Sequence, residues 1–273
     1  MIENILSIDV EEIFHIEYLN NSIEKYHYRS IENLPSILDL LGEYDVSATF
    51  FIVGEIAEKY PDILRMIEEE GHEIAFHGWC NIPLWNHNYE SFISEVEKFL
   101  AIYPKCRGYR APFFSINKSS EWALQILENL GFDYDSSVFP VKTPLYGSTS
   151  APLYPYKPSK DHLYKEDEKG IMEFPLLIHS ILGFRIPTAG GFYLRTMPSL
   201  VNRSIRTRNN KGHPGVIYIH NWELDPETPK INLGTYRNFI TYWNIDKSIK
   251  FIKKILKDFN FTSFKHYLID NKI

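Results

Sequence analysis

The stretch VSATFFIVGEIAEKYPDILRMIEEEGHEIAF, residues 46–76, indicates the fold because it contains one complete strand–helix–strand unit. Residues 46–54 are rich in β-branched and aromatic side chains, which is typical of a buried strand. Residues 56–70 are expected to form a helix that ends at Gly71, and residues 72–76 to form a second strand. Two strands joined by a helix in this way lie parallel in one sheet.

The same alternation continues on both sides of this unit. A strand is predicted for residues 4–10, and the apolar positions of residues 30–41 keep helical spacing. Helices are predicted for residues 89–103 and 119–132, with a short strand at 106–112 between them. Strand signals return at 170–178 and 215–224, and a helix is predicted for 245–259. The alternation predicts an α/β fold, either a barrel or an open doubly wound sheet.

One stretch interrupts this regularity. Residues 141–169 are rich in prolines and aromatic side chains, and they are expected to form an irregular loop insertion. A substrate lid and a plain bridging insertion both fit such a loop. Because the chain contains no internal repeat, low-complexity tract or linker, residues 1–273 are expected to form a single domain.

Composition excludes several classes of protein. The net charge of −6 and the scattered basic residues argue against a nucleic-acid binder. Two cysteines give neither a disulfide framework nor a zinc-finger spacing, and the amino terminus lacks a signal-peptide pattern. We therefore expect a cytoplasmic protein. No apolar stretch reaches the roughly 20 residues needed for a transmembrane helix, but the aromatic content leaves peripheral membrane contact open.

Ionisable side chains stand at five predicted strand ends. The carboxyl ends of parallel strands are where α/β folds gather ligands and catalytic groups. Helix capping or solvation would explain each residue alone, but the whole series favours a functional site. The residues are Asp9 with Glu11 and Glu12, His77, Arg110, Asp135 and His220.

The motifs that carry these residues resemble those of a known family. SIDVEE, TFFIVG with GHEIAFHG, GYRAPFFS, YDSSVFP and VIYIHNWELDP occur in this order. They resemble the NodB-type polysaccharide deacetylases of carbohydrate esterase family 4, most closely the branch associated with exopolysaccharide and surface-glycan biosynthesis. The resemblance implies a distorted (β/α) barrel of about seven parallel strands. It also implies a metal-dependent hydrolase that removes N-acetyl groups from a sugar.

The resemblance implies catalytic roles for five residues. Asp9 would be the base, and Arg110 would keep Asp9 ionised and in place. His220 would be the general acid that protonates the leaving amine, with Asp135 orienting its imidazole. The backbone N–H of Phe113 would stabilise the oxyanion.

A divalent metal, with zinc as the expected ion, is also implied. Its ligands would be Glu11, with Glu12 as the alternative acid, together with His77 and Asn81. The family usually has a second histidine where Asn81 stands, and a neutral amide is a weak zinc ligand. His87 is either a substitute ligand or a surface-loop residue.

Four residues are candidates for substrate binding. Trp79, Tyr193 and Trp222 could stack on sugar rings, although core packing is the more common role for such side chains. Arg195 follows a Gly-Gly pair and could meet an anionic sugar or a phosphate; a surface position in a plain turn is equally compatible with the sequence.

The expected partner is an N-acetylated saccharide, either nucleotide-linked or lipid-linked. Two other functions remain compatible with the sequence. One is a catalytically inactive sugar-binding barrel, which the asparagine at position 81 favours. The other is a metal-independent amide hydrolase of the allantoinase-like type.

Overall fold

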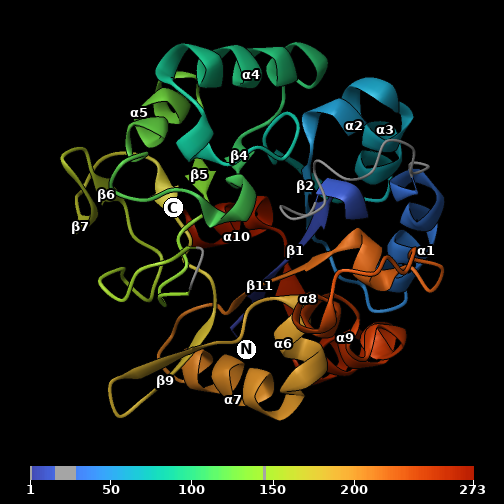
Figure 1. Cartoon of the computed structure of the whole chain (residues 1–273). Coiled ribbons are helices and arrows are strands. Elements are labelled where there is room, and N and C mark those ends of the chain that lie inside the picture. Colours follow the sequence, from blue (N-terminus) through green and yellow to red (C-terminus); the bar gives the residue numbers. More distant parts are fainter. Residues whose placement is uncertain (1, 16–28, 144–145) are drawn as a thin grey trace.

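Parallel strands form the centre of the structure, a computed structural model that describes residues 2–15, 29–143 and 146–273 (Figure 1). In spatial order the strands are β11 (Val216–His220), β1 (Asn4–Val10), β2 (Thr49–Ile52), β3 (Glu73–Phe76), β4 (Gly108–Tyr109), β5 (Tyr134–Asp135) and β8 (Met172–Glu173). A further short strand, β12 (Phe261–Thr262), pairs with β1. Every pairing in this sheet is parallel.

The sheet curls without closing. Within the described residues the outer strands β8 and β11 do not pair with each other. The segment between them bonds to β11 instead: Leu177 donates its N–H to Val216 O at 3.0 Å, and Tyr218 donates to Ala189 O at 3.1 Å. The predicted α/β fold with about seven parallel strands is therefore confirmed, as a curled half-barrel.

Helices surround this sheet (Figure 1). The helices are α1 (Ser30–Gly42), α2 (Gly54–Lys59), α3 (Asp62–Glu69), α4 (Tyr89–Ile102), α5 (Trp122–Asn129), α6 (Gly191–Thr196), α7 (Pro198–Asn209), α8 (Thr235–Tyr242), α9 (Ser248–Asp258) and α10 (Phe264–Asn271). Of these, α1, α4, α5 and α9 correspond to the helices predicted for residues 30–41, 89–103, 119–132 and 245–259. No helix among the described residues is both long enough and apolar enough to cross a membrane.

The single helix predicted for residues 56–70 is wrong, because the chain forms two helices there. α2 ends at Lys59 and α3 begins at Asp62. Pro61 stands between them, and Tyr60 before it has φ −132° and ψ 65°, outside the helical region. A proline removes one backbone donor and disfavours helical geometry in the preceding residue, so the helix is interrupted here.

The half-barrel is filled by apolar side chains. All seven residues of β1 are buried, as expected for a central strand with neighbours on both sides. Phe264, at the start of α10, stacks on Tyr134 at a centroid distance of 4.6 Å and contacts the ring of Phe51 at 5.7 Å. At the carboxyl end of the sheet, the register of β1 and β11 places Asp9 opposite His220, the last residue of β11.

Two antiparallel pairs lie outside the main sheet. Residues 141–169, predicted as an irregular insertion, contain β6 (Pro158–Ser159) and β7 (His162–Glu166) within their described part. A second pair, β9 (Ile178–Ile181) and β10 (Phe184–Pro187), forms a hairpin that the sequence patterns did not predict. Three residues after the end of β10 the chain reaches Gly190, which precedes α6 (Gly191–Thr196).

Candidate active site

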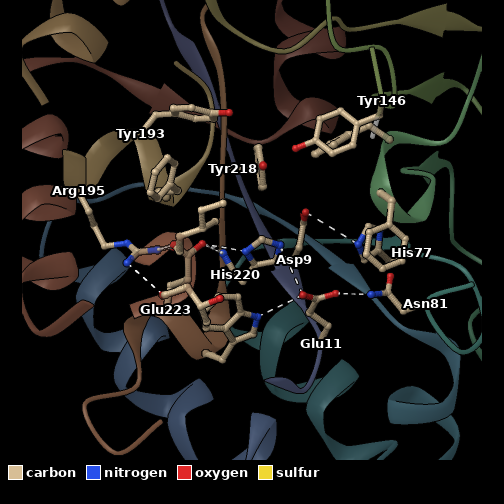
Figure 2. Close-up of a pocket in the computed structure, with 17 residues that line it drawn as sticks. Asp9, Glu11, His77, Asn81, Tyr146, Tyr193, Arg195, Tyr218, His220 and Glu223 are labelled. Carbon is tan, nitrogen blue, oxygen red and sulfur yellow. Dashed lines mark hydrogen bonds and ion pairs between the residues drawn. The ribbon is translucent and has the colours of Figure 1, made fainter. Parts of the chain in front are cut away.

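A cavity of about 200 Å³ opens at the carboxyl ends of β1, β3 and β11 (Figure 2). Asp9, Glu11, His77, Asn81 and His220 all line it. Four of them were predicted at strand ends and Asn81 as a metal ligand, and the structure brings all five together. The rest of the wall is largely aromatic, with side chains from Phe113, Phe114, Tyr146, Phe192, Tyr193, Tyr218 and Trp222.

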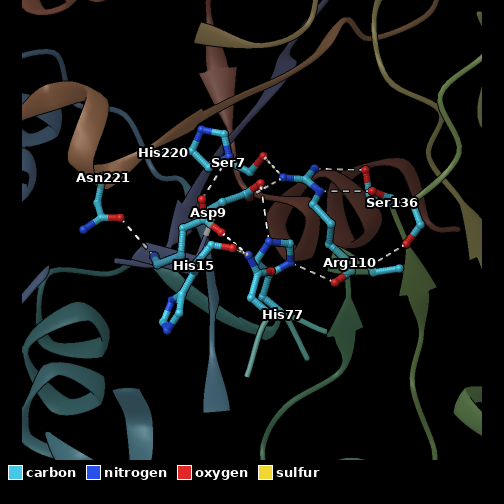
Figure 3. A network of polar contacts seen from close by, with 12 residues as sticks. Ser7, Asp9, His15, His77, Arg110, Ser136, His220 and Asn221 are labelled. Atoms are coloured by element: carbon cyan, nitrogen blue, oxygen red, sulfur yellow. Dashed lines mark hydrogen bonds and ion pairs between the residues drawn. The ribbon is translucent and has the colours of Figure 1, made fainter. Parts of the chain in front are cut away.

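Asp9 is held by a buried ion pair (Figure 3). Its Oδ1 accepts from Arg110 Nη1 at 2.6 Å, and the same nitrogen donates to Ser7 Oγ at 2.8 Å. Arg110 is fully buried and also donates to the carbonyl and hydroxyl of Ser136. The buried guanidinium of Arg110 therefore has the Asp9 carboxyl group as its counter-ion, and the contact fixes where that carboxyl group points. Oδ2 of Asp9 remains on the side of His77.

His77 presents a lone pair to Asp9. Its Nδ1 lies 2.9 Å from the carbonyl oxygen of Arg110, which can only accept, so Nδ1 carries the proton. Burial is the main reason that the pKa of His77 is lowered, so the ring is neutral near pH 7. Nε2 is then an acceptor, and it lies 3.9 Å from Asp9 Oδ2.

Glu11 is surrounded by N–H donors. Its Oε2 accepts from Asn81 Nδ2 at 2.6 Å, and its Oε1 accepts from Trp222 Nε1 at 3.2 Å. His220 Nε2 lies 3.5 Å from the same Oε1. Both oxygens of Glu11 are therefore occupied by side-chain donors within the protein.

The predicted zinc ligands do not fit a zinc ion in this arrangement. The amide of Asn81 turns its NH₂ group toward Glu11, and this orientation is supported by a second bond from Nδ2 to His15 O at 3.1 Å. Asn81 Oδ1 is buried without a hydrogen-bond partner among the described residues, but it is a neutral oxygen and a weak zinc ligand, and the NH₂ group of the same amide occupies the Glu11 oxygen. Among residues 2–15, 29–143 and 146–273, no group of three or more His, Cys, Asp and Glu side chains could hold a metal ion.

His220 belongs to a chain of charges that runs into the protein (Figure 2). Its Nδ1 lies 2.8 Å from Glu223 Oε1, and Glu223 Oε2 accepts from Arg195 Nη2 at 2.7 Å. Burial opposes the charged imidazole, but the carboxylates of Glu11 and Glu223 outweigh it and raise the pKa of His220 to about 9. Burial likewise opposes the charge on Glu223, but Arg195 and His220 lower its pKa to about 2. His220 is thus a proton donor near pH 7.

The expectation that Asp135 orients His220 is wrong. Asp135 accepts from Ser137 Oγ at 2.6 Å and from Ser137 N–H at 3.1 Å, and it is the register partner of Glu173 on β8. Burial raises the pKa of both carboxyl groups. Glu223 takes the position beside His220 that Asp135 was expected to occupy.

The predicted substrate-binding residues divide into two groups. Tyr193 and Trp222 line the cavity, although the Trp222 ring stacks on His220, with centroids 5.1 Å apart. Trp79 does not line it: its ring lies against Gly54, and Lys98 Nζ sits 3.5 Å from the ring centroid. Its predicted role in stacking on a sugar is therefore wrong.

Arg195 lines the cavity, but protein groups hold its guanidinium. It is 2% exposed, and Nη1 and Nη2 bond to Glu223 and to the carbonyl oxygens of Thr241 and Trp243. Burial and these bonds do not support the role in meeting an anionic sugar, which stays a prediction. They give Arg195 a different place, as the counter-ion of Glu223.

Neither alternative metal ligand reaches the cavity lining. Glu12 Oε2 accepts from the backbone N–H of Arg29 at 2.9 Å, on another side of β1. His87 lies before α4, where Nδ1 is 3.3 Å from Ser91 Oγ and Nε2 is 3.8 Å from Glu95. These positions do not support His87 as a metal ligand in place of the missing second histidine.

The backbone around the cavity adopts unusual conformations. Phe113 and Phe114 have φ angles of +54° and +49°, and Asn81 has φ +54°. Left-handed backbone costs on the order of 1–2 kcal/mol for a residue that is not glycine. Such residues cluster at functional sites, and Phe113, the predicted oxyanion donor, lines the cavity.

Four residues that contribute to the site were not predicted from the sequence. Glu223 holds His220, Tyr146 and Tyr218 line the wall, and Gly191 leaves room for Glu223. A Cβ atom on Gly191 would come within 2.5 Å of both Glu223 carboxylate oxygens. The spacing of three residues between His220 and Glu223 was a usable signal, because it places two ionisable groups at one strand end.

Comparison with known proteins connects this geometry to a family. The family model described as polysaccharide deacetylase matches residues 27–134, and one described as a domain of unknown function, DUF3473, matches residues 136–269. A peptidoglycan-N-acetylglucosamine deacetylase from Bacillus cereus is 37% identical over 83 residues, which are 30% of this chain and 30% of that protein. The chain therefore matches only about a third of that relative.

Solved structures agree on the fold. A protein from Mycobacterium smegmatis assigned to the polysaccharide deacetylases superposes with a TM-score of 0.56 at 17% identity, covering 95% of this chain and 86% of that one. Peptidoglycan deacetylase PdaC from Bacillus subtilis gives 0.51 at 14% identity, covering 99% and 91%. At such identities these likenesses concern the fold alone. The family match over residues 27–134 shows that the chain carries a polysaccharide deacetylase domain of the NodB type, carbohydrate esterase family 4.

Proposed function

We propose that the cavity hydrolyses the N-acetyl group of an N-acetylated saccharide, releasing acetate and a free amine. The observation that carries this proposal is the pairing of a base with an acid across two neighbouring strands. Asp9 and His220 are register partners in β1 and β11. Arg110 holds Asp9 in a buried ion pair, while the pKa of about 9 keeps His220 protonated. A carboxylate that can accept a proton and an imidazolium that can donate one suit general acid–base hydrolysis.

The proposed reaction begins with a water between Asp9 Oδ2 and His77 Nε2. Both atoms are acceptors, so they direct the water's hydrogens toward themselves and its lone pair toward the substrate. Asp9 takes a proton as the oxygen adds to the acetyl carbon. The C–N bond then breaks while His220 Nε2 gives its proton to the departing nitrogen, and the backbone N–H of Phe113 is the candidate oxyanion donor.

This proposal contains no step through a metal ion. Members of the family are generally metal-dependent, and zinc was the expected cofactor. However, the donors around Glu11 give that carboxylate another role: it faces His220 and helps to keep the imidazole charged. Glu11 thus acts as a counter-ion in the proposed reaction.

Aromatic side chains support a sugar as the substrate. Tyr146, Tyr193 and Tyr218 combine flat apolar rings with hydroxyl groups, which suits the faces and hydroxyls of a pyranose. Since the B. cereus relative is named for an N-acetylglucosamine substrate, we propose an N-acetylhexosamine, carried on a nucleotide or a lipid. The sheet joins both matched regions of the chain, and we propose that they work as one domain.

A sugar-binding protein without turnover is the second candidate. The specific observation in its favour is Asn81, whose NH₂ group occupies a Glu11 oxygen that would otherwise face a metal. Such a protein would bind glycans saturably in the same cavity and release no acetate.

Acetate release from N-acetylglucosamine oligomers and from UDP-N-acetylglucosamine tests these functions. We expect release by the wild type in the presence of EDTA, and loss of on the order of a hundredfold or more in His220→Gln. His87→Gln is the matched control, because His87 lies outside the cavity lining. Saturable binding of the oligomers without acetate, with or without added zinc, would support the second candidate and contradict the first.

A further inference from the structure

The β9–β10 hairpin has a firmly held base and an apolar tip. At its base, His179 is buried and its Nδ1 lies 3.2 Å from Ser204 Oγ on α7. Arg185 donates to the carbonyl oxygens of Pro140 and Ala151, at 2.8 and 2.9 Å. From this base the hairpin extends away from the body of the molecule beside α7 (Figure 1). A rigid base makes the tip a fixed projection.

Three large apolar side chains stand exposed together at the tip. Ile181 and Phe184 face each other across the end of the two strands, and they are 45% and 74% exposed. Leu182, in the turn between them, is 92% exposed. Clustered exposed apolar side chains on a soluble domain mark an interaction site, whereas scattered ones do not.

The backbone of the turn disfavours the leucine that occupies it. Leu182 has φ +50° and Gly183 has φ +82°, so the two-residue turn is of the type with positive φ at both positions. Asn-Gly is the preferred pair in such a turn, and leucine is a poor choice because its Cβ crowds the backbone. The tip therefore keeps an apolar side chain at a position where folding alone favours asparagine.

Exposed basic residues lie on α7, the helix against which this hairpin packs. Although the chain has a net charge of −6, residues 174–222 contain no aspartate or glutamate. Their six basic residues are Arg185, Arg195, Arg203, Arg206, Arg208 and Lys211. Arg203, Arg206 and Lys211 are exposed on α7 and the turn after it, and no salt bridge found among the described residues involves any of them.

We propose that this protein docks on an anionic lipid bilayer through the β9–β10 hairpin. Leu182 and Phe184 insert among the headgroups, and the basic residues of α7 meet the lipid phosphates. Binding to such an interface needs only a small apolar area combined with electrostatic attraction. A stable protein partner would need about 800 Å² on each side, more than three side chains on a narrow tip can offer.

The test is co-sedimentation of the full chain with lipid vesicles. We expect binding to phosphatidylcholine vesicles that contain phosphatidylglycerol, weaker binding to pure phosphatidylcholine, and release as salt screens the charges. Leu182→Asn should weaken binding roughly tenfold, given the transfer free energy of one leucine side chain. Because this variant creates the preferred Asn-Gly turn, its thermal stability should equal or exceed that of the wild type.

Two further variants separate the apolar and the electrostatic contributions to vesicle binding. Ile269→Asn exchanges an equally apolar side chain, 62% exposed on α10, and should bind vesicles like the wild type. Arg203→Gln combined with Lys211→Gln should weaken binding to the anionic vesicles and leave binding to pure phosphatidylcholine unchanged.

Three results would overturn the proposal. The wild type could fail to sediment with either vesicle, or Leu182→Asn and Ile269→Asn could have equal effects. Light scattering could instead show a dimer that dissociates in Leu182→Asn, with no vesicle binding, which would make a second copy of the chain the occupant. Acetate release from a soluble substrate is read separately in every variant, so failure of docking and failure of hydrolysis are distinguishable.

Discussion

Glu223 Oε1 lies 2.8 Å from His220 Nδ1, which leaves Nε2 of the same ring facing Glu11 and the cavity. A carboxylate can only accept from Nδ1, so this contact fixes both the tautomer and the direction of the imidazole. Arg195 holds Glu223 from behind with an ion pair of 2.7 Å. The proton that His220 donates is therefore controlled by two residues that need not touch the substrate.

The pH dependence of hydrolysis tests this control. Since His220 must be protonated to act as the acid, acetate release should stay constant up to pH values near 9 and fall above them. Glu223→Gln removes a carboxylate that raises this pKa, so the alkaline limb should move to lower pH. A pH profile of kcat/KM for the wild type and for Glu223→Gln measures the alkaline limb of each protein. An unchanged alkaline limb in Glu223→Gln would show that Glu223 does not control the acid.

The same shifts predict how stability depends on pH. The pKa of His220 is raised from 6.5 to about 9, so its stabilisation is fully present below pH 6.5 and is lost as pH rises through about 9. The pKa of Glu223 is lowered from 4.5 to about 2, so its stabilisation is present above pH 4.5 and is lost as pH falls through about 2. Urea unfolding at a series of pH values measures the free energy of unfolding in each range. In His220→Gln the alkaline loss should be smaller.

Gly191→Ala should disturb the acid without removing any ionisable group. The new Cβ would lie within 2.5 Å of both Glu223 oxygens, so the carboxylate must move away from His220. Misplacing a catalytic group by about 1 Å can cost on the order of a hundredfold in rate, and acetate release measures the loss. Gly42→Ala is the matched control, because a Cβ there meets nothing within 4 Å. Full activity in Gly191→Ala would contradict the predicted crowding.

Asp9→Asn should impair both folding stability and activity. It leaves the fully buried guanidinium of Arg110 without its counter-ion, which typically costs about 3–5 kcal/mol in the free energy of unfolding. Glu43→Gln breaks the exposed pair with Lys253 and should change the free energy of unfolding far less, because solvent screens this pair. Urea denaturation compares the two variants. Equal losses would mean that burial does not strengthen the Asp9–Arg110 pair.

Asn81→His tests why the site does not fit zinc. The substitution removes the amide that donates to Glu11 and restores two histidines four residues apart, a spacing that suits metal binding. We expect the purified variant to retain stoichiometric zinc, measured by elemental analysis, and the wild type to retain none. Asn86→His, outside the cavity lining, is the control. Stoichiometric zinc in the wild type would contradict our account of Glu11.

Local patterns predicted the elements that local sequence controls. The buried strand at residues 4–10 and the helices α1 and α4 follow from apolar spacing, and the rule about strand ends brought Asp9, His77 and His220 to one cavity. These successes share one physical basis. Side-chain periodicity and the parallel direction of the strands are both readable from the sequence.

The remaining errors concern partners that only the folded chain selects. Asp135 stands at a strand end as predicted, but the neighbouring strand is β8, which brings Glu173 rather than His220 beside it. Trp79 follows His77 by two residues, yet the gap left by the missing side chain of Gly54 admits its ring. The β9–β10 hairpin escaped prediction because its Leu-Gly turn lacks the usual asparagine.

The central position of β1 has a consequence for the order of folding. This strand leaves the ribosome well before two of its partners, β11 and β12, which lie more than 200 residues further along the chain. Contacts of such high sequence separation form slowly, and β1 must wait for them. Asp9 can meet His220 only after β11 has been synthesised, so a nascent chain that stops before β11 cannot assemble the proposed acid–base pair.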